Sequence, residues 1–120
     1  MKKLIIALFV LGIALPAFAG LKVKDVVGTW SYKIEVDYEV QTGTLVFKKE
    51  GKELTGEVVT ADGLTIPMSN VEIRENNVLY FETEVEYTVM KISMTIEGEK
   101  YSGTISVDGQ EVPVTGEKIE

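Results

Sequence analysis

Short segments of alternating apolar and polar residues, separated by turn residues about every ten positions, constrain the fold of this chain most strongly. In "WSYKIEVDYEV", residues 30–40, apolar side chains occupy every second position from Trp30 to Val40, and polar or charged side chains fill the positions between them. Strict alternation places the two kinds of side chain on opposite faces of a β-strand. No segment after residue 20 has a sustained helical period, so the sequence predicts an all-β domain.

Turn residues divide the chain into eight predicted strands. These strands run roughly over residues 28–40, 43–49, 53–60, 64–73, 78–87, 89–97, 100–107 and 111–119, with turns expected at Thr42-Gly43, Glu50-Gly51, Asp62-Gly63, Asn76-Asn77, Gly98 and Asp108-Gly109. Because the loops are short, each strand pairs with its predecessor in an antiparallel meander. Closing eight strands into a barrel removes both open edges. We therefore predict an all-β, eight-stranded antiparallel up-and-down barrel with its apolar faces inward.

An internal repeat accompanies this pattern. The segment "KELTGEVVTADGLTIPM" (52–68) is similar to "EKYSGTISVDGQEVPV" (99–114), and "EVDYEV" (35–40) is similar to "EVEYTV" (84–89). The matched positions include Gly56 with Gly103. The sequence thus predicts two similar four-strand halves, although similar turn chemistry in two hairpins would produce part of the same likeness.

The first nineteen residues have the features of a secretory signal peptide. Lys2 and Lys3 precede an apolar run over residues 4–15, and Ala17-Phe18-Ala19 precedes Gly20 as a small-residue cleavage site. The chain has no Cys and therefore no acceptor for a lipid anchor. We expect a signal peptide over 1–19, a single domain over 20–120, no membrane anchor and a periplasmic or secreted location.

Charge argues against several partners. Residues 20–120 contain 10 basic and 19 acidic residues, a formal charge of −9. Such a surface repels phosphate groups, so we expect no nucleic acid partner.

An outer-membrane barrel with lipid-facing aromatic residues is an alternative fold. It would place two acidic rows in a narrow lumen at a high desolvation cost; these rows are Glu35, Asp37, Glu39 and Glu82, Glu84, Glu86.

The segment "DVVGTW", residues 25–30, resembles the Gly-x-Trp motif that opens the first strand of lipocalins and related calycins. This resemblance implies a short helical turn before the motif and a Trp at the closed end of the barrel, beneath a basic residue from the last strand. Gly28, Trp30 and Lys118 occupy the corresponding positions. Independently, the last strand of a closed meander lies beside the first, which brings Lys118 near Trp30. The patterns "GTW" (28–30), "LTG" (54–56) and "G…IP" (63–67) are also similar to those of small secreted bacterial barrel domains, and the resemblance implies a binding function.

An eight-stranded barrel has an interior that is either filled by side chains or holds one small ligand. The larger adaptable or polar-tipped side chains on the predicted inward faces are the candidate ligand contacts: Tyr32, Tyr38, Phe81, Tyr87, Met90, Met94 and Tyr101. Gly56, Gly103 and Gly116 are also predicted to face inward. They would either leave room for a ligand or relieve a bent or crowded strand.

Catalytic and metal chemistry find no support in the sequence. The chain has no His and no Cys, so its serines lack the usual general base and metal sites lack their commonest ligands. The acidic rows fit a solvated outer face better than a calcium site, because no loop wraps around them. We predict a non-enzyme without cofactor or metal that binds a small apolar ligand. The alternative is a filled barrel that binds or inhibits a protein partner.

Overall fold

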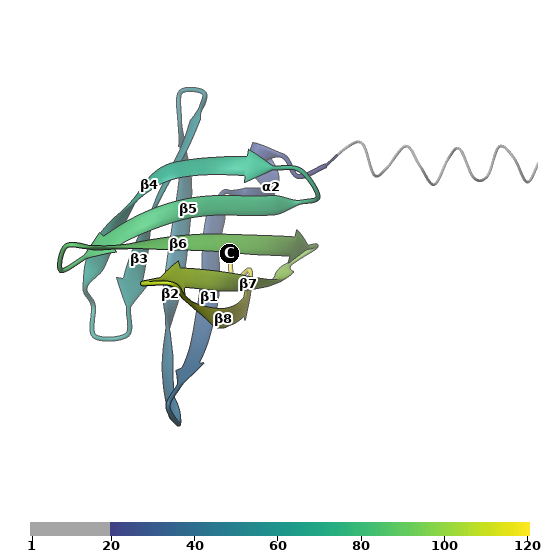
Figure 1. Ribbon diagram of the computed structural model, residues 1–120. Coiled ribbons are helices and arrows are strands. Elements are labelled where there is room, and N and C mark those ends of the chain that lie inside the picture. The colour runs from purple at the N-terminus through teal and green to yellow at the C-terminus, as the bar shows by residue number, and fades with distance from the viewer. Residues whose placement is uncertain (1–19) are drawn as a thin grey trace, which may run out of the picture.

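The computed structural model describes residues 20–120, which form a closed eight-stranded barrel (Figure 1). The predicted signal peptide lies outside the described residues. A short helix and eight strands follow one another along the chain: α2 (Val23–Val26), β1 (Gly28–Val36), β2 (Glu39–Glu50), β3 (Glu53–Thr60), β4 (Thr65–Arg74), β5 (Val78–Val85), β6 (Thr88–Glu97), β7 (Lys100–Val107) and β8 (Gln110–Glu117). Each strand is antiparallel to its predecessor, and β8 returns to β1. The predicted fold, an antiparallel up-and-down barrel consistent with a lipocalin-like architecture, is confirmed.

Two of the eight ladders are much shorter than the others. Strands β3 and β4 pair only over residues 57–59 and 65–67, and β8 pairs with β1 only at Lys33 and Ile34, apart from an isolated bridge between Trp30 and Lys118. The barrel therefore consists of two continuous sheets, β1–β3 and β4–β8, joined along two short seams. In Figure 1, β5, β6 and β7 run across the view, whereas β1 and β2 run steeply down it.

The first hairpin turns earlier than predicted. Asp37 and Tyr38 have positive φ angles of 50° and 69° and form the two-residue loop between β1 and β2. The expected first strand over 28–40 and the expected turn at Thr42-Gly43 are therefore wrong, and Gly43 lies within β2 opposite Tyr32. Glu86 and Tyr87 form the same kind of loop between β5 and β6. Such a loop shifts the inward face by one residue, as the pairs Val36–Glu39 and Val85–Thr88 show. Tyr38 and Tyr87 nevertheless continue the apolar alternation of the preceding strands, so the pattern placed both turns too late.

The two ends of the barrel differ. The β1–β2, β3–β4, β5–β6 and β7–β8 hairpins all lie at one end, which we call the open end, because successive strands alternate in direction. Helix α2 and the C-terminal residues lie at the other end, which we call the closed end. Val26 of the helix is fully buried, and Thr29 at the start of β1 donates a backbone hydrogen bond to the Glu120 carbonyl.

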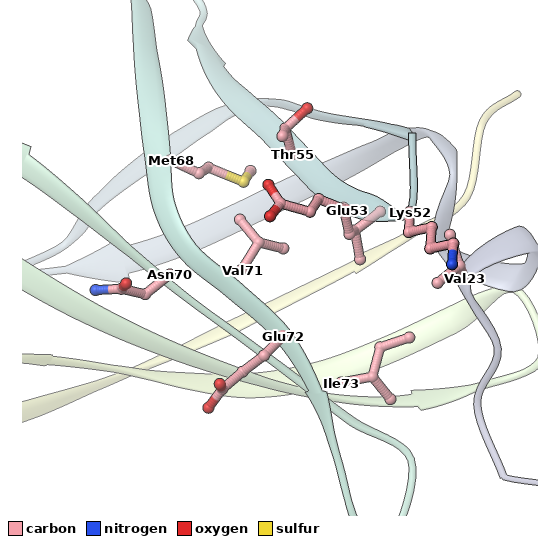
Figure 2. Close-up of a pocket in the computed structure, with 10 residues that line it drawn as sticks. Val23, Lys52, Glu53, Thr55, Met68, Asn70, Val71, Glu72 and Ile73 are labelled. Atoms are coloured by element: carbon pink, nitrogen blue, oxygen red, sulfur yellow. The ribbon is translucent and has the colours of Figure 1, made fainter. Parts of the chain in front are cut away.

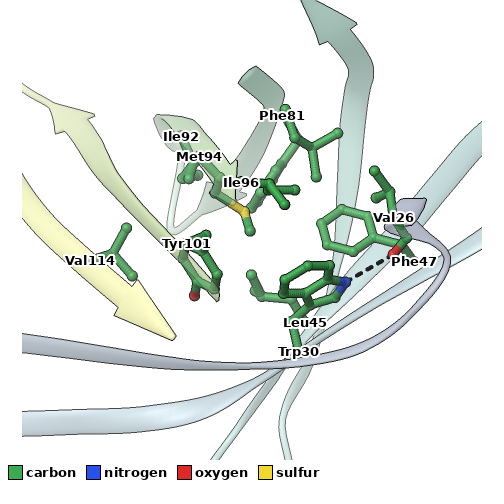
Figure 3. Packing of buried hydrophobic residues seen from close by; sticks show 11 residues of the cluster. Val26, Trp30, Leu45, Phe47, Phe81, Ile92, Met94, Ile96, Tyr101 and Val114 are labelled. Carbon is green, nitrogen blue, oxygen red and sulfur yellow. Dashed lines mark hydrogen bonds between the residues drawn. The ribbon is translucent and has the colours of Figure 1, made fainter. Parts of the chain in front are cut away.

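Large side chains fill the closed half of the barrel (Figure 3). The most deeply buried are Val26, Trp30, Phe47, Leu79, Phe81 and Met94. Phe47 and Phe81 pack edge to face with ring centroids 5.7 Å apart, and Trp30 packs in the same way on Tyr101 at 6.0 Å. Such aromatic pairs add to the stabilisation that comes from burial alone.

Trp30 has two polar neighbours. Its indole N–H donates a hydrogen bond of 2.9 Å to the Val26 carbonyl, drawn as a dashed line in Figure 3. The Lys118 ammonium lies 5.7 Å from the ring centroid and 3.3 Å from the Asp25 carbonyl. At Gly28, whose φ is +136°, a Cβ would collide with the Glu120 carbonyl. These contacts link helix α2, β1 and the C-terminal residues at the closed end.

The matched glycines of the repeat occupy corresponding places. Gly56 is the fourth residue of β3 and pairs with Phe47, and Gly103 is the fourth residue of β7 and pairs with Met94. Phe47 and Met94 are buried, so both glycines face inward. The internal duplication itself stays a prediction, which a superposition of residues 35–73 on 84–119 would test.

Candidate functional site: the barrel interior

The open half of the barrel contains an apolar cavity of about 250 Å³. Its lining comes from all eight strands: Tyr32, Ile34, Gln41, Leu45, Val58, Thr60, Ile66, Phe81, Thr83, Val85, Met90, Ile92, Met94, Tyr101, Ile105 and Val114. None of these residues is charged. The innermost of them, including Phe81 and Met94, belong to the filled core, so the cavity is open on the hairpin side and closed below.

Five of the seven predicted ligand contacts lie together in this cavity: Tyr32, Phe81, Met90, Met94 and Tyr101. Alternation placed them correctly because each lies inside a strand, where successive side chains point to opposite faces.

Tyr38 and Tyr87 do not lie in the cavity, and the prediction that they face the interior is wrong. Each is the second residue of a two-residue hairpin loop and is fully exposed, with relative exposures of 108% and 98%. Their backbones are in the left-handed region, where a bulky residue is unusual. The apolar pattern continued through both loops and therefore included them by mistake.

The inward glycines do not provide the space. A Cβ on Gly103 would collide with the Ser93 backbone carbonyl, and one on Gly116 with the Ser31 carbonyl. A Cβ on Gly56 would lie 2.7 Å from both the Met68 sulfur and a backbone oxygen. The reading of these glycines as room for a ligand is therefore wrong, and they allow adjacent backbone or a neighbouring side chain to come close.

The buried Thr83 hydroxyl in the cavity has no partner from the protein. Thr83 is 5% exposed, and none of the side-chain hydrogen bonds within residues 20–120 includes its hydroxyl. In the same part of the chain, no polar side-chain atom that is sealed from solvent lacks a hydrogen bond. The Thr83 hydroxyl must therefore reach the space of the cavity, where a ligand or a water molecule can bond to it.

Two tyrosines place phenol groups in or beside the cavity. Burial raises the pKa of Tyr32, and the negative charge of Asp62 raises it further. Burial also raises the pKa of Tyr101, whose hydroxyl donates a hydrogen bond of 2.7 Å to the Ser31 carbonyl. Both phenols are consequently neutral hydrogen-bonding groups at physiological pH.

Sequence reasoning missed most of the aliphatic lining and all of its small polar groups. Thr83 and Val85 alternate with Glu82 and Glu84 on β5, so the same pattern that identified Phe81 could have identified them. Gln41 was obscured by the misplaced turn. The polar character of Thr60 and Gln41 gave no sign that either lines the interior.

A second and larger hollow lies in the barrel wall. It has a volume of about 540 Å³ and separates the first half of β3 from the second half of β4, where these strands no longer pair (Figure 2). A β-bulge at Asn70 and Val71 in β4 accompanies the separation. Lys52 and Glu53 line this lateral groove together with apolar side chains, whereas the cavity has no charged lining. The cavity is therefore the better candidate for an apolar ligand.

No protein family model, curated protein or solved structure gives a significant match to this chain. Within residues 20–120, no helix is long and apolar enough to cross a membrane.

Proposed function

We propose that this chain is a non-enzymatic binding protein that holds a small, mostly apolar molecule in the open half of its barrel. The observation that carries the proposal is the uncharged cavity of about 250 Å³ above a filled core. A water molecule takes up about 30 Å³ of liquid, so the cavity is several times larger than the defects that normally remain in a protein interior. An apolar cleft or cavity with a few polar groups is typical of small-molecule sites.

The same proposal includes a relationship to lipocalins and calycins and a periplasmic or secreted location. The Gly28-x-Trp30 pattern, the preceding helical turn and the contact of Lys118 with Trp30 support the relationship. The sequence of residues 1–19 supports the location. The absence of His and Cys from the sequence supports a binding role over catalysis.

A neutral apolar dye whose fluorescence rises in apolar surroundings, N-phenyl-1-naphthylamine, tests the proposal. We expect a saturable rise for the parent protein. Val58→Phe should weaken dye binding at least tenfold, because the added ring occupies the cavity that Val58 lines. Val59→Phe is the matched control, since its neighbouring position on β3 faces the other side of the strand.

Thermal unfolding of both variants shows whether each remains folded. No saturable signal with the parent protein, or equal dye binding by the two folded variants, would contradict the proposal. If the parent protein binds the dye, native mass spectrometry of protein purified from its own host would identify a ligand that co-purifies.

A protein-binding module is the second candidate, favoured by the exposed apolar side chains at the open end. Tyr38, Leu64 and Tyr87 are 108%, 58% and 98% exposed at the tips of three hairpins. Exposed apolar groups that gather at one end of a protein often mark a contact surface. Failure of the parent protein to bind the dye would leave this candidate in place.

A further inference from the structure

Every connection at the open end is acidic. The four hairpin segments, residues 35–40, 60–65, 84–89 and 106–111, contain no Lys or Arg. We call their acidic residues the acidic rim: Glu35, Asp37, Glu39, Asp62, Glu84, Glu86, Asp108 and Glu111.

Most basic residues lie toward the opposite end. Within residues 20–120 the exceptions are Lys33 and Lys91, which lie inside strands β1 and β6, and Lys33 is paired with Glu35 at 3.5 Å. Acidic and basic residues are mixed around the closed end, whereas the mouth of the cavity carries charge of one sign. A negatively charged mouth above a low-dielectric cavity raises the local concentration of positively charged molecules.

The charge of the rim extends to the cavity itself. Asp62 acts on the phenol of Tyr32, which lines the cavity, and makes ionisation of this phenol less favourable. Glu39 pairs with Val36 and lies two residues before Gln41, a lining residue, so it is on the inner face of β2. With no positive charge in the lining, nothing inside the cavity offsets this negative field.

The exposed tyrosines add a second kind of contact for a cation. Tyr38 and Tyr87 present free rings beside acidic neighbours at two hairpin tips. Aromatic faces attract ammonium groups, with quaternary ammonium ligands as the best-known case.

A metal ion is a poor fit for this rim. Within the part of the chain that the structure describes, no three acidic side chains converge as a metal site requires. Dispersed charge suits a bulky organic cation better than a small hard ion.

We infer that the ligand of this cavity is a cationic amphiphile, whose apolar body lies in the cavity and whose ammonium-type head group lies at the acidic rim. This inference rests on the proposed function and narrows its ligand class. The free Thr83 hydroxyl would accept or donate one hydrogen bond deeper inside. An anionic molecule with the same apolar body would meet a repulsive mouth.

Competition between matched amphiphiles tests the inference. The assay measures how well octyltrimethylammonium and octyl sulfate, both below their micelle concentrations, displace N-phenyl-1-naphthylamine from the parent protein at low ionic strength. We expect the cation to bind at least about tenfold more tightly than the anion, with a smaller difference at high salt because the charges of the rim are exposed.

Two double variants show whether the rim causes this preference. Glu39→Gln with Asp62→Asn removes two rim charges and should reduce the preference at least about threefold. Glu75→Gln with Glu97→Gln removes two charges near the connections of the closed end and should leave it unchanged. Dye binding by each variant reports whether the cavity is intact.

The outcomes separate the two proposals. A parent protein that does not bind the dye overturns the proposed function and the inference with it. Dye binding with equal affinity for the cation and the anion overturns the inference alone, and so does a preference that both double variants reduce equally, because net charge would then explain it.

Discussion

The Tyr101 hydroxyl lies 2.7 Å from the backbone carbonyl of Ser31 and donates a hydrogen bond to it across the seam between β8 and β1. Tyr101 is on β7, and its partner on β8 is Gly116, which has no side chain that could block this approach. The Ser31 hydroxyl also contacts β8, where it accepts a hydrogen bond from the Glu117 amide at 3.0 Å. Side chains therefore close a seam that has few backbone pairs.

Tyr101→Phe should lower the free energy of unfolding by about 1–3 kcal/mol, because it leaves a half-buried carbonyl without its partner while it keeps the packing on Trp30. Urea unfolding measures the change. Tyr87→Phe, at a fully exposed position, is the control and should stay within about 0.5 kcal/mol of the parent. Equal effects of the two substitutions would show that the hydrogen bond does not hold the seam.

Trp30→Ala should lower the free energy of unfolding by about 3–5 kcal/mol, since it removes a fully buried ring and leaves the Val26 carbonyl without its indole donor. Lys118→Met keeps most of the side-chain stem and removes only the ammonium, so it should cost about 1 kcal/mol or less. Urea unfolding distinguishes the two. A loss below 1 kcal/mol for Trp30→Ala would contradict its place in the core.

Gly103→Ala should destabilise the barrel by at least about 1–3 kcal/mol, because the new methyl group would meet the Ser93 carbonyl of β6 and the strands would have to separate. Ser102→Leu is the control on the same strand, where the side chain is exposed, and should have little effect. Thermal unfolding of both proteins makes the comparison. A Gly103→Ala variant as stable as the parent would mean that the strands are not in such close contact.

Replacement of Asp37-Tyr38 by Asn-Gly should stabilise the first hairpin by about 1 kcal/mol. Both residues have positive φ angles, a conformation that Asn and Gly adopt at lower cost. Tyr38 is fully exposed, so its removal loses no packing. A higher thermal midpoint would support this account. A lower midpoint would show that the Tyr38 ring contributes to stability.

The free energy of unfolding should fall as the pH rises above about 10, the ordinary pKa of tyrosine. Burial raises the pKa of Tyr101 in the folded protein; burial and the hydrogen bond to Glu82 raise that of Tyr80 to about 12. Over this range the unfolded chain loses phenol protons that the folded chain keeps, so rising pH favours unfolding.

Urea unfolding at about pH 9 and about pH 11.5 measures this dependence. The Tyr80→Phe and Tyr101→Phe variants should each have a smaller fall than the parent protein. An unchanged slope in both variants would show that other groups cause the loss.

The architecture was predictable because local signals agreed with one another. Alternation around Phe81 and Met94 identified inward faces, and short loops allowed only a meander. The position of Lys118 near Trp30 followed from closure, since the last strand of a closed meander lies beside the first.

The hairpin tips and the cavity were less accessible to sequence reasoning. A two-residue loop shifts the inward face by one residue, but Tyr38 and Tyr87 are apolar and continue the earlier alternation, so they were predicted to be strand residues although they are turn residues. The volume of a cavity depends on how side chains from all strands meet in space, which no single segment encodes. The close approach at Gly103 likewise depends on β6, a separate strand.

The two short seams divide the barrel wall into two shells, β1–β3 and β4–β8, which few residue pairs join. Cavity-lining side chains come from both shells, Tyr32 and Val58 from one and Phe81 and Ile105 from the other, so the size of the chamber depends on how far apart the shells stand. The β1–β8 seam is fastened by side chains, whereas β3 and β4 share only three residue pairs. Separation of β3 from β4 would widen the chamber without breaking either continuous sheet. In the proposed binding role, the spacing of the two shells along this seam would set the largest molecule that the chamber could hold.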